Sequence, residues 1–534
     1  MQTMTTSRRT SVIVVGAGPT GLTLANLLGQ SDISAVVIER NHGTVNEPRA
    51  VSIDDESLRT MQAIGLDDAV LADVVAGYGV HYYTRPGGHC FGRVEPSSAV
   101  YGFPKRNAFR QPLFEATLLR GLGRFASVEV LFGHKLLCIE QTDEGVSATI
   151  QREDGSILTI DAQYLVGCDG GRSPVRNLIG STLQGSSFES RWLVVDTDSD
   201  DDTFWQTRVY CDARRPVVEV PGPHRTRRFE FLLHAHESDE ATLKSERLTE
   251  LLRPFRGEKP TSIVRKTIYT FHARVADKWR RGRVFLAGDA AHLTPPYAGQ
   301  GMNSGVRDAH NLGWKLAAVI GQGLPPSLLD SYELERRDHA WALIRLAMNL
   351  GLVMAPKTVM RARVIAAVFT AIGFIPPLRD YFLQMRFKPK PRYLTGLVLP
   401  DELGKSSIVG QMLPQPRVRA NDTVRPFDDL IGPGFSIVQF GGEPRRGIMT
   451  LTSPLWQRLA ATRVRVEPAD FGAVGQAYQG RCVLLRPDRY VAGSFDPDDE
   501  QAFASALEAL MANRDCSPPG PASSSREQLA TRKS

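Results

Sequence analysis

The chain has 534 residues, of which 42% are hydrophobic and 23% charged, the balance of a globular protein with about three domains. Its 64 basic and 58 acidic residues give a formal net charge of +6, too small for a surface of this size to indicate nucleic-acid binding. Six scattered cysteines form no CxxC pair and no Cys/His cluster, which argues against a disulfide framework or structural zinc. The longest apolar run, residues 364–375, is shorter than the roughly 20 residues of a membrane span, and no signal peptide is evident. We therefore expect a cytoplasmic protein with free thiols and no membrane span.

The first predicted elements are a strand, a glycine-rich turn, a helix and a second strand. Residues 11–15 are a continuous apolar run, typical of a buried parallel strand, and GAGPTG follows at 16–21. Residues 22–29 have helical periodicity, and a second apolar run at 35–38 ends in Glu39. A strand, a glycine turn, a helix, a strand and a terminal acid in this order predict a dinucleotide site.

The glycine-rich turn has the residue types that such a site needs. Gly16 and Gly18 carry no side chain, so a phosphate can approach the backbone, and Gly21 lets the helix pack tightly on the strand. The N-terminus of the helix supplies N–H donors for a pyrophosphate. Glu39 would accept hydrogen bonds from the ribose hydroxyls of an adenosine.

The rest of the chain predicts further mixed structure. In chain order we expect an amphipathic helix at 52–65, a β-meander at 128–169, a second, largely β layer that carries the substrate at 191–271, a buried strand at 283–287, a long helix at about 303–320, mostly helical structure at 328–382, a linker at 388–416 and a further α/β domain at 422–510. The tail from residue 513 is rich in Ser, Pro and charge, which predicts disorder.

Two further motifs follow predicted strands. The first, CDGGRSPVR at 168–176, is a tight turn between a strand and a helix, and an ordinary αβ loop is the alternative interpretation. The second begins with GRVFLAGDAAH at 282–292 and continues through two prolines to GQGMN at 299–303. Its strand delivers Asp289 to the edge of the sheet, where the carboxylate can hydrogen-bond the polyol chain of a flavin. Its glycine-rich segment begins a helix whose N–H groups favour negative charge on the flavin ring.

In this order and spacing, the three motifs resemble those of the class A, FAD-dependent aromatic monooxygenases. The resemblance covers about residues 10–500. Five stretches resemble the 3-(3-hydroxyphenyl)propionate hydroxylases of the phenol-hydroxylase-like branch: 53–62, 106–112, 227–231, 335–340 and 385–391.

The resemblance implies an α/β fold with a Rossmann-like FAD-binding domain, an interleaved β-sheet substrate domain and a C-terminal thioredoxin-like domain. The corresponding ranges are 10–190 for the first part of the FAD-binding domain with its β-meander, 191–275 for the substrate domain, 276–390 for the second part of the FAD-binding domain with a helical layer, 405–512 for the thioredoxin-like domain and 513–534 for the tail. Because the chain has no CxxC, that last domain is expected to be structural.

The resemblance also implies an activity. The enzyme would hold non-covalent FAD, use NADH or NADPH as a transient co-substrate together with O₂, and insert one oxygen ortho to a phenol hydroxyl. The implied substrate is a small aromatic acid, 3-(3-hydroxyphenyl)propanoate or 3-hydroxycinnamate, and the product is the 2,3-dihydroxyphenyl acid. No second GxGxxG follows a strand, so the nicotinamide has no Rossmann domain of its own. Hydroxylation of another phenol, resorcinol or polyketide remains open, as do a non-hydroxylating flavoprotein oxidase or reductase and a homo-oligomer.

Family roles transfer to matching positions. Glu39 would hold the ribose, Arg49 would lie near the pyrophosphate or the ring, Gln111 and Asp289 would contact the ribityl chain, and Asp169 with Arg172 would organise the pyrophosphate. The implied FAD-binding residues are Gly16, Gly18, Pro19, Thr20, Gly21, Glu39, Arg40, Arg49, Gln111, Asp169, Gly288, Asp289, Pro296, Gly299, Gly301, Met302 and Asn303. The flavin performs the chemistry, so no catalytic side chain is assigned, and the pocket candidates are Pro296, Tyr297 and His292.

Histidines and arginines outside these motifs have competing interpretations. His292 fits a hydrogen-bonded scaffold residue better than a catalytic one, and the isolated histidines His89, His310 and His339 predict no metal site. An arginine can clamp a substrate carboxylate through its bidentate fork, and the candidates are Arg110, Arg225, Arg227 and Arg228. A solvated hairpin explains the last three equally well, and the family pattern has an apolar residue in place of Arg110. The apolar stretch 341–375 predicts a packed helical layer rather than a membrane-binding surface.

Overall fold

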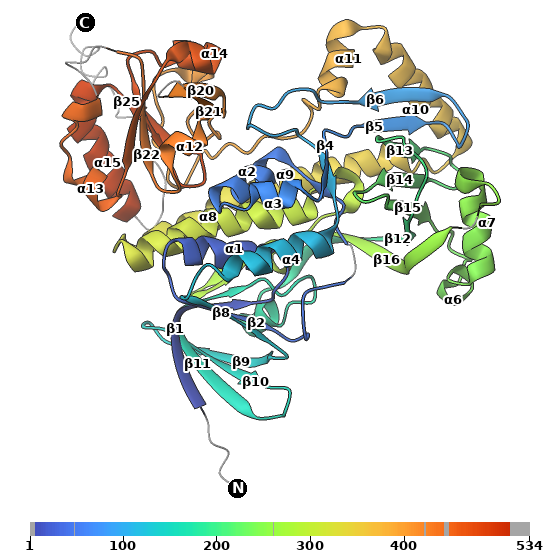
Figure 1. The fold of residues 1–534 in the computed structure, drawn as a ribbon, viewed down its shortest axis with the longest axis horizontal. Coiled ribbons are helices and arrows are strands. Elements are labelled where there is room, and N and C mark those ends of the chain that lie inside the picture. Colours follow the sequence, from blue (N-terminus) through green and yellow to red (C-terminus); the bar gives the residue numbers. More distant parts are fainter. Residues whose placement is uncertain (1–5, 47–48, 260, 421–422, 443–447, 513–534) are drawn as a thin grey trace, which may run out of the picture. The chain divides into compact units, whose positions relative to one another are not determined.

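The computed structural model describes residues 6–46, 49–259, 261–420, 423–442 and 448–512 (Figure 1). The tail expected to be disordered, 513–534, lies outside these residues. The chain divides into two compact units. Unit 1 comprises Met1–Gly323, Arg336–Pro391 and Leu413–Pro433, and unit 2 comprises Leu324–Glu335, Arg392–Met412 and Gly434–Ser534. The stretch 388–416, expected as a linker, is divided between both units.

The first sheet of unit 1 contains the predicted dinucleotide unit. Its main path runs β17–β18–β11–β1–β2–β8, and β10 and β9 extend it antiparallel from β11. The strands are β1 (Thr6–Val15), β2 (Ala35–Glu39), β8 (Val128–Phe132), β9 (Lys135–Gln141), β10 (Val146–Gln151), β11 (Ile157–Gly167), β17 (Arg280–Arg281) and β18 (Val284–Leu286). The predicted meander is present from β9 to β11, whereas β8 joins the parallel part of the sheet beside β2.

Three parallel strands bring the three sequence motifs together. In the pairing of β1 with β11, Val15 lies opposite Gly167, and in the pairing of β11 with β18, Gly167 lies opposite Leu286. The chain enters the three motifs directly after these strand ends. Because the carboxyl ends of parallel strands meet at one edge of a sheet, the motifs lie side by side there. Helices α1 (Pro19–Gln30) and α8 (Gly301–Gly321) pack against each other next to this sheet (Figure 1).

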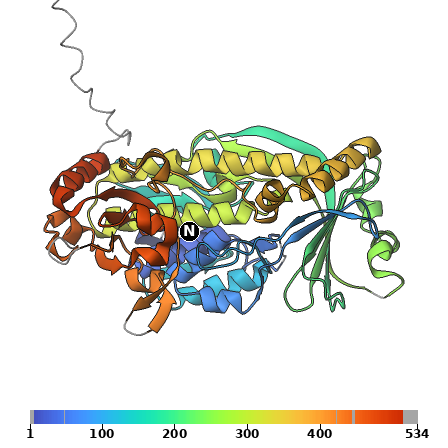
Figure 2. The ribbon, with the colours of Figure 1, turned by 90° about the horizontal axis from the view of Figure 1, so that it is seen from above.

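A second sheet of unit 1 corresponds to the predicted substrate layer. Its order is β19–β16–β12–β15–β14–β13–β5–β6. The strands are β5 (Val80–Tyr83), β6 (Cys90–Val94), β12 (Leu183–Asp198), β13 (Thr207–Tyr210), β14 (Val217–Pro221), β15 (Arg227–Leu232), β16 (Ser262–Ala276) and β19 (His292–Leu293). Two of them, β5 and β6, come from residues well before 191; β5 pairs with β13, and β6 pairs with β5 (Figure 2, blue beside green). The range 191–275 expected for this domain therefore omits three strands of its sheet, β5, β6 and β19.

Short strands and helices complete the fold of this part of the chain. A small sheet has the order β3–β7–β4, with β3 (Ser52–Ile53), β4 (Val74–Ala76) and β7 (Asn107–Phe109), and β20 (Arg417–Ala420) pairs with β21 (Thr423–Pro426). The remaining helices are α2 (Asp55–Ala63), α3 (Asp67–Leu71), α4 (Gln111–Leu122), α5 (Pro174–Leu178), α6 (Asp239–Thr242), α7 (Ser245–Arg256), α9 (Ser331–Met354), α10 (Val359–Gly373), α11 (Pro376–Leu383) and α12 (Asp428–Ile431). The helices expected at 52–65, 303–320 and 328–382 are confirmed.

Helices α10 and α11 are less buried than a packed layer requires. Neither helix contains a fully buried residue, and large apolar side chains are open to solvent, among them Met360 at 68% and Phe374 at 82%. Only the inner side of α10, through Ile365 and Phe369, packs on the hydrophobic cluster beneath it. Among the described residues no single helix is long and apolar enough to cross a membrane. Helices α10 and α11 taken together, with a bend of 111° between them, have the length and composition of a membrane span, and nothing else indicates one.

Unit 2 contains a four-stranded mixed sheet with the order β23–β22–β24–β25. The elements are β22 (Ser436–Phe440), α13 (Pro454–Arg458), β23 (Thr462–Val466), α14 (Gly472–Ala477), β24 (Cys482–Leu485), β25 (Val491–Phe495) and α15 (Glu500–Ala512). β22 pairs in parallel with β23 and antiparallel with β24. Inside this unit Arg486 forms two 2.8 Å bonds with Glu335 and a 2.6 Å bond with Asp488, all with buried side chains.

Candidate active site

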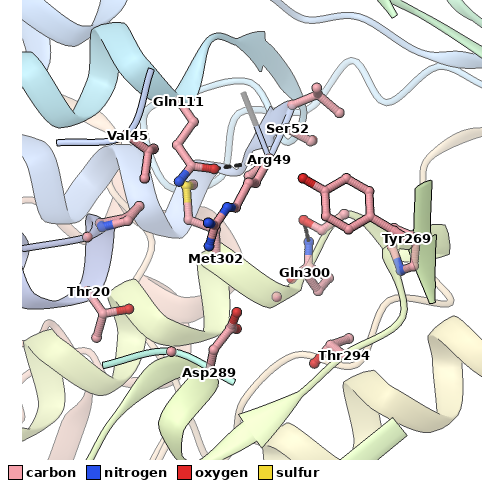
Figure 3. Close-up of a pocket in the computed structure, with 18 of the residues that line it drawn as sticks. Thr20, Val45, Arg49, Ser52, Gln111, Tyr269, Asp289, Thr294, Gln300 and Met302 are labelled. Atoms are coloured by element: carbon pink, nitrogen blue, oxygen red, sulfur yellow. Dashed lines mark hydrogen bonds between the residues drawn. The ribbon is translucent and has the colours of Figure 1, made fainter. Parts of the chain in front are cut away.

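A single cavity of about 490 Å³ in unit 1 is lined by residues from all three motifs. Fourteen of the predicted FAD-binding residues line it: Gly16, Gly18, Pro19, Thr20, Glu39, Arg40, Arg49, Gln111, Asp169, Asp289, Pro296, Gly299, Gly301 and Met302. The pocket candidate Tyr297 lines it as well. In the close-up of Figure 3, Thr20, Arg49, Gln111, Asp289 and Met302 surround one part of the cavity, with Tyr269 across from them.

The glycine turn forms a cradle that no side chain fills. Gly16 has φ +106°, and a Cβ there would lie 2.5 Å from the carbonyl oxygen of Cys168, so the position requires glycine. Gly21 does not line the cavity; a Cβ on it would lie 2.0 Å from the oxygen of Gly16, which confirms its role in close packing. Gly18 is the N-cap of α1 and has open space where a Cβ would be. The N-terminus of α1 therefore faces the cavity with free access to its N–H groups.

Glu39 is placed beside this cradle by the end of β2. Its Oε2 accepts a hydrogen bond of 3.0 Å from the backbone N–H of Ala17, and its Oε1 accepts one of 2.9 Å from the N–H of Asn41. These bonds hold the carboxylate in one orientation at the edge of the cavity, where it still has lone pairs for a ligand hydroxyl.

The second motif contributes mainly to the scaffold. Asp169 lines the cavity, but its carboxylate accepts hydrogen bonds from the hydroxyl of Ser173 and, at 2.9 Å, from the N–H of Val175 at the start of α5. Burial raises the pKa of Asp169. Arg172 is exposed and does not line the cavity, so its expected contact with the pyrophosphate is not supported. Arg176, which the sequence analysis did not single out, donates a 3.0 Å bond to the carbonyl of Ala290 and so ties this motif to the third.

Asp289 follows the end of β18, and its side chain lines the cavity (Figure 3). It forms no hydrogen bond with another residue that the structure describes, and the protein packed around it raises its pKa. A carboxylate that faces a cavity without a partner can accept hydrogen bonds from the hydroxyls of a ligand. Gly288, the residue before it, lies outside the cavity lining and has φ +62°; a Cβ there would lie 2.5 Å from the hydroxyl of Thr20.

His292 lies behind the cavity wall and not in it, which corrects its place among the pocket candidates. Its Nε2 is 2.6 Å from Oδ2 of Asp308, and both side chains are fully buried. Asp308 also accepts a 3.0 Å bond from the N–H of Gly288 and a 2.9 Å bond from Nε of Arg336. The cluster fixes the turn that presents Asp289, so His292 acts on the site through the scaffold.

The loop before α8 is fastened from outside by Asn303. This residue does not line the cavity, contrary to its expected contact with FAD. Its Nδ2 donates to the carbonyls of Ser52 at 3.0 Å and Gly299 at 2.7 Å, and its Oδ1 accepts from the N–H of Asp54 at 3.0 Å. Asn303 thus fixes the N-terminal turn of α8 against β3, with the helix N-terminus at the cavity.

Comparisons with known proteins agree with this geometry. Residues 9–347 match the model of the FAD binding domain family, and residues 410–510 match the HcaD C-terminal domain. A 3-(3-hydroxyphenyl)propionate/3-hydroxycinnamic acid hydroxylase of Mycolicibacterium smegmatis is 39% identical over 94% of this chain and 93% of its own length. The enzyme of the same name from Comamonas testosteroni is 37% identical over 94% and 96%. The chain belongs to the class A FAD-dependent monooxygenases.

Solved structures support the same assignment. Aklavinone-11 hydroxylase in complex with FAD and aklavinone superposes with a TM-score of 0.78 at 25% identity, covering 94% of this chain and 99% of that one. The flavin-dependent monooxygenase PieE, at 20% identity and a TM-score of 0.80, covers 95% and 99% and shows the same fold. This monooxygenase therefore has an α/β FAD-binding fold with a distinct C-terminal domain, and it is a flavin-dependent aromatic hydroxylase.

The residues present fit FAD. The open glycine cradle and the N-terminus of α1 suit a pyrophosphate, and Glu39 at the end of β2 suits an adenosine ribose. The unpartnered carboxylate of Asp289 suits a ribityl hydroxyl. Gln111 is held nearby, since its Oε1 accepts a 2.7 Å bond from the N–H of Ala50 and its Nε2 donates a 2.7 Å bond to Glu115.

Substitution of Asp289 by alanine is expected to lower the affinity of the monooxygenase for FAD about 10- to 100-fold, because a hydrogen bond to a charged group contributes roughly 1.5–3 kcal/mol. The thermal unfolding midpoint of the apoprotein should stay within about 2 °C of wild type, since Asp289 bonds to no other described residue. Titration of apoprotein with FAD, followed by flavin fluorescence, measures the effect. Wild-type affinity in the variant would remove Asp289 from the site.

The four arginines expected to clamp a carboxylate are placed elsewhere or are already paired. Arg110 lines a small neighbouring pocket and not the main cavity. Arg225 is exposed and pairs with Asp201, and Arg227 is buried among acidic residues, 3.3 Å from Asp200 and 3.5 Å from Glu219. Neither lines the cavity. Their acidic partners lie on distant parts of the chain or opposite strands, which the sequence does not reveal.

Arg228 does line the cavity, but its charge is already balanced. Its Nε and Nη2 donate to Asp196 at 2.7 and 3.1 Å, and its Nη1 donates to the carbonyl of Arg49 at 2.7 Å. Glu230 lies 3.8 Å away, and burial raises the pKa of this second carboxyl group. The side chain therefore joins the substrate sheet to the segment that carries Arg49.

Most of the apolar half of the cavity was not predicted from the sequence. The residues that line this half also belong to one hydrophobic cluster: Tyr78, Val80, Tyr82, Val94, Val209, Val218, Val220, Phe271, Tyr297, Leu350, Met354, Met385 and Phe387. Tyr297 packs edge-on against Trp192, with ring centroids 5.8 Å apart, and burial raises its pKa to about 12. At neutral pH this tyrosine is a neutral wall residue and not a base.

Two of three adjacent acids at the start of α2 are paired with cations. Arg307 pairs with Asp54 and, at 2.6 Å, with Glu56, and Lys388 lies 2.8 Å from Asp54. Asp54, Asp55 and Glu56 are all buried. The ion pairs of Asp54 and Glu56 with Arg307 fasten α2 to α8, and Asp55 accepts a 3.2 Å hydrogen bond from the N–H of Glu56. Asp54 and Glu56 therefore have a structural role.

Proposed function

We propose that this monooxygenase hydroxylates 3-(3-hydroxyphenyl)propanoate and 3-hydroxycinnamate ortho to the phenol hydroxyl, with NADH or NADPH and O₂ as co-substrates. The main support for this function is one continuous cavity that joins a dinucleotide cradle to a chamber with aromatic and aliphatic walls. The identity of 37–39% to hydroxylases of these two acids supports the substrate. The product is the corresponding 2,3-dihydroxyphenyl acid.

The chain positions its ligands and excludes water. Bound FAD supplies oxygen activation and transfer, which no side chain here can provide. The apolar walls formed by Tyr297, Phe271 and Met354 would keep water from the reacting edge of the substrate and pack against its ring. The N-terminus of α8 directs N–H groups into the cavity, where they favour negative charge on a bound ring.

We propose that FAD is held without a covalent link and that the nicotinamide binds only transiently. Two observations support this proposal. The cysteines among the described residues of unit 1 are free, and of these only Cys168, which is buried, lines the cavity. Burial raises the pKa of Cys168 well above its usual range, so its thiol does not attack a ring.

We also propose that the C-terminal domain has a thioredoxin-like fold without disulfide exchange. Its order of strand, helix, strand, helix, two strands and helix, with one parallel pair, supports that fold. Cys482 is the only free cysteine within its described residues, and burial raises its pKa to about 12. A neutral buried thiol is a poor nucleophile, so a structural role follows.

The proposed reaction is tested with purified holoenzyme. Addition of 3-(3-hydroxyphenyl)propanoate is expected to stimulate NADH oxidation at least about 10-fold, with equimolar consumption of O₂ and formation of the catechol and little H₂O₂, because apolar walls around the bound substrate favour transfer of oxygen over its loss as peroxide. Product is identified by mass spectrometry. Stimulation by a resorcinol or a polyketide and not by the acid would reassign the substrate, and stoichiometric H₂O₂ with every phenol would indicate an oxidase.

A further inference from the structure

We propose that Arg106 binds the carboxylate of the aromatic substrate and selects acids over neutral phenols. The inference deepens the proposed function, on which it rests for the identity of the acid, and it assigns the carboxylate to a residue other than Arg110, Arg225, Arg227 or Arg228.

Arg106 is held in the wall of the apolar half of the cavity. It directly precedes β7 and is half-buried. Its Nη2 donates a 3.1 Å hydrogen bond to the hydroxyl of Tyr78, and its guanidinium lies over the same ring, 4.7 Å from the centroid. Tyr78 is itself 2% exposed. A stacked and hydrogen-bonded guanidinium is orientated in advance, so little side-chain entropy is lost when it binds a ligand.

No carboxylate of the described residues pairs with Arg106. Its side chain interacts with Tyr78, whereas Arg228, the cavity arginine on the substrate sheet, is paired with Asp196. A half-buried cation in an apolar wall has lost part of its hydration without gaining a counter-ion. A ligand carboxylate restores the balance, and the planar fork of arginine can bind both of its oxygens.

The position of Arg106 separates it from the cations around the cofactor cradle. Arg49 lies over Asp289 next to Gln111 (Figure 3), and Arg40 follows β2 beside Glu39. Arg106 instead belongs with the tyrosines of the hydrophobic cluster. Burial raises the pKa of Tyr82 to about 12, and the positive charge of Arg106 acts to lower that pKa. The charge of Arg106 is therefore felt at Tyr82 in the apolar wall of the cavity.

These features predict how the acid would lie. The aromatic ring enters the chamber lined by apolar side chains, and the three-carbon chain carries its carboxylate toward the guanidinium held by Tyr78. A neutral phenol of the same shape gains the apolar contacts and loses the ion pair. Because removing one partner of a buried charge pair is costly, Arg106 should dominate discrimination between these two ligands.

The test compares 3-(3-hydroxyphenyl)propanoate with 3-propylphenol, which lacks the carboxylate. Binding to the oxidised holoenzyme is measured by perturbation of the flavin spectrum, so the result does not depend on turnover. Arg106→Met keeps much of the side-chain volume and is expected to weaken binding of the acid at least about 30-fold while changing binding of 3-propylphenol less than about 3-fold. Arg106→Lys keeps the charge without the fork and should give an intermediate loss of about 10-fold.

Two further variants separate positioning from structure. Tyr78→Phe removes the hydrogen bond that orientates the guanidinium and is expected to weaken binding of the acid about 3- to 10-fold, with no change for 3-propylphenol. Arg225→Met removes an exposed arginine outside the cavity and should bind both ligands as wild type does. FAD content and the thermal unfolding midpoint are recorded for every variant.

Two outcomes would overturn the assignment. They are wild-type binding of the acid no tighter than that of 3-propylphenol, and an unchanged preference for the acid in Arg106→Met, whether or not both ligands bind more weakly. Failure of the proposed function would give a different result: the wild-type enzyme would bind the acid through Arg106 but would not form the catechol.

Discussion

Replacement of Gly18 by alanine is expected to lower FAD affinity at least about 10-fold without unfolding the protein. Gly18 has φ −85° and ψ −175°, which alanine adopts freely, and its Cβ would meet no protein atom within 4 Å. The added methyl group instead occupies the cradle that the pyrophosphate must approach, and overpacking of this kind costs about 1–3 kcal/mol. FAD titration of the apoprotein and thermal unfolding measure the two effects separately.

Two other glycines serve as controls for this result. In Gly21→Ala the Cβ would lie 2.0 Å from the oxygen of Gly16, so α1 cannot pack on β1 and the unfolding midpoint should fall together with FAD content. In Gly373→Ala, within α10, the Cβ meets nothing within 4 Å and both properties should match wild type. Tight FAD binding by Gly18→Ala would show that the pyrophosphate does not approach this turn.

Replacement of Asp308 by alanine is expected to lower the free energy of unfolding of the FAD-binding unit by about 3–5 kcal/mol, because it breaks a buried ion pair from one side. Asp308 is fully buried and accepts hydrogen bonds from Gly288, His292 and Arg336. Urea unfolding followed by intrinsic fluorescence measures the loss. Asp338→Ala, which removes an exposed carboxylate on α9, should change stability by no more than about 0.5 kcal/mol.

The same carboxylate predicts a pH dependence. Burial acts to raise the pKa of Asp308, but the positive charges of His292 and Arg336 outweigh it and lower the pKa to about 2. A depressed folded-state pKa contributes stability above the unfolded value near 4, and this stability is lost as the pH falls through about 2. Asp308→Asn should lack this component of acid unfolding between pH 4 and 2. An identical acid-unfolding curve for wild type and Asp308→Asn would contradict the assignment.

The parts of the site that the sequence predicted are those made by contiguous residues. The glycine turn, Glu39 and Asp289 each follow a strand directly, and the register of three parallel strands then brings their segments to one edge. Local periodicity was sufficient to predict these strands. The rule that parallel strands share a carboxyl edge was sufficient to place the motifs together.

The substrate half could not be predicted in this way. Arg227 and Arg228 stand in a basic run that suggests a clamp, yet their acidic partners come from other strands, and only the folded sheet shows that their charges are balanced. Arg106 lies in one of the stretches that carry the family resemblance, at 106–112. The orientation of its guanidinium, however, depends on a hydrogen bond to Tyr78, which is 28 positions away in the chain. Pairing between distant segments leaves no periodic signal in either one.

Strands β5 and β6 have a consequence for exchanging parts between relatives. The substrate sheet is assembled from two separate stretches of chain, since β13 pairs in parallel with β5 and β5 pairs with β6. A chimera that transplants 191–275 alone would lack β5, β6 and β19 of the donor. The donor strands would then have to pair with the strands of the recipient, which contribute Tyr82 and Val94 to the cavity. The transferable module for ligand preference is therefore discontinuous, and residues 74–109 must be exchanged together with 183–276 and with β19 at 292–293.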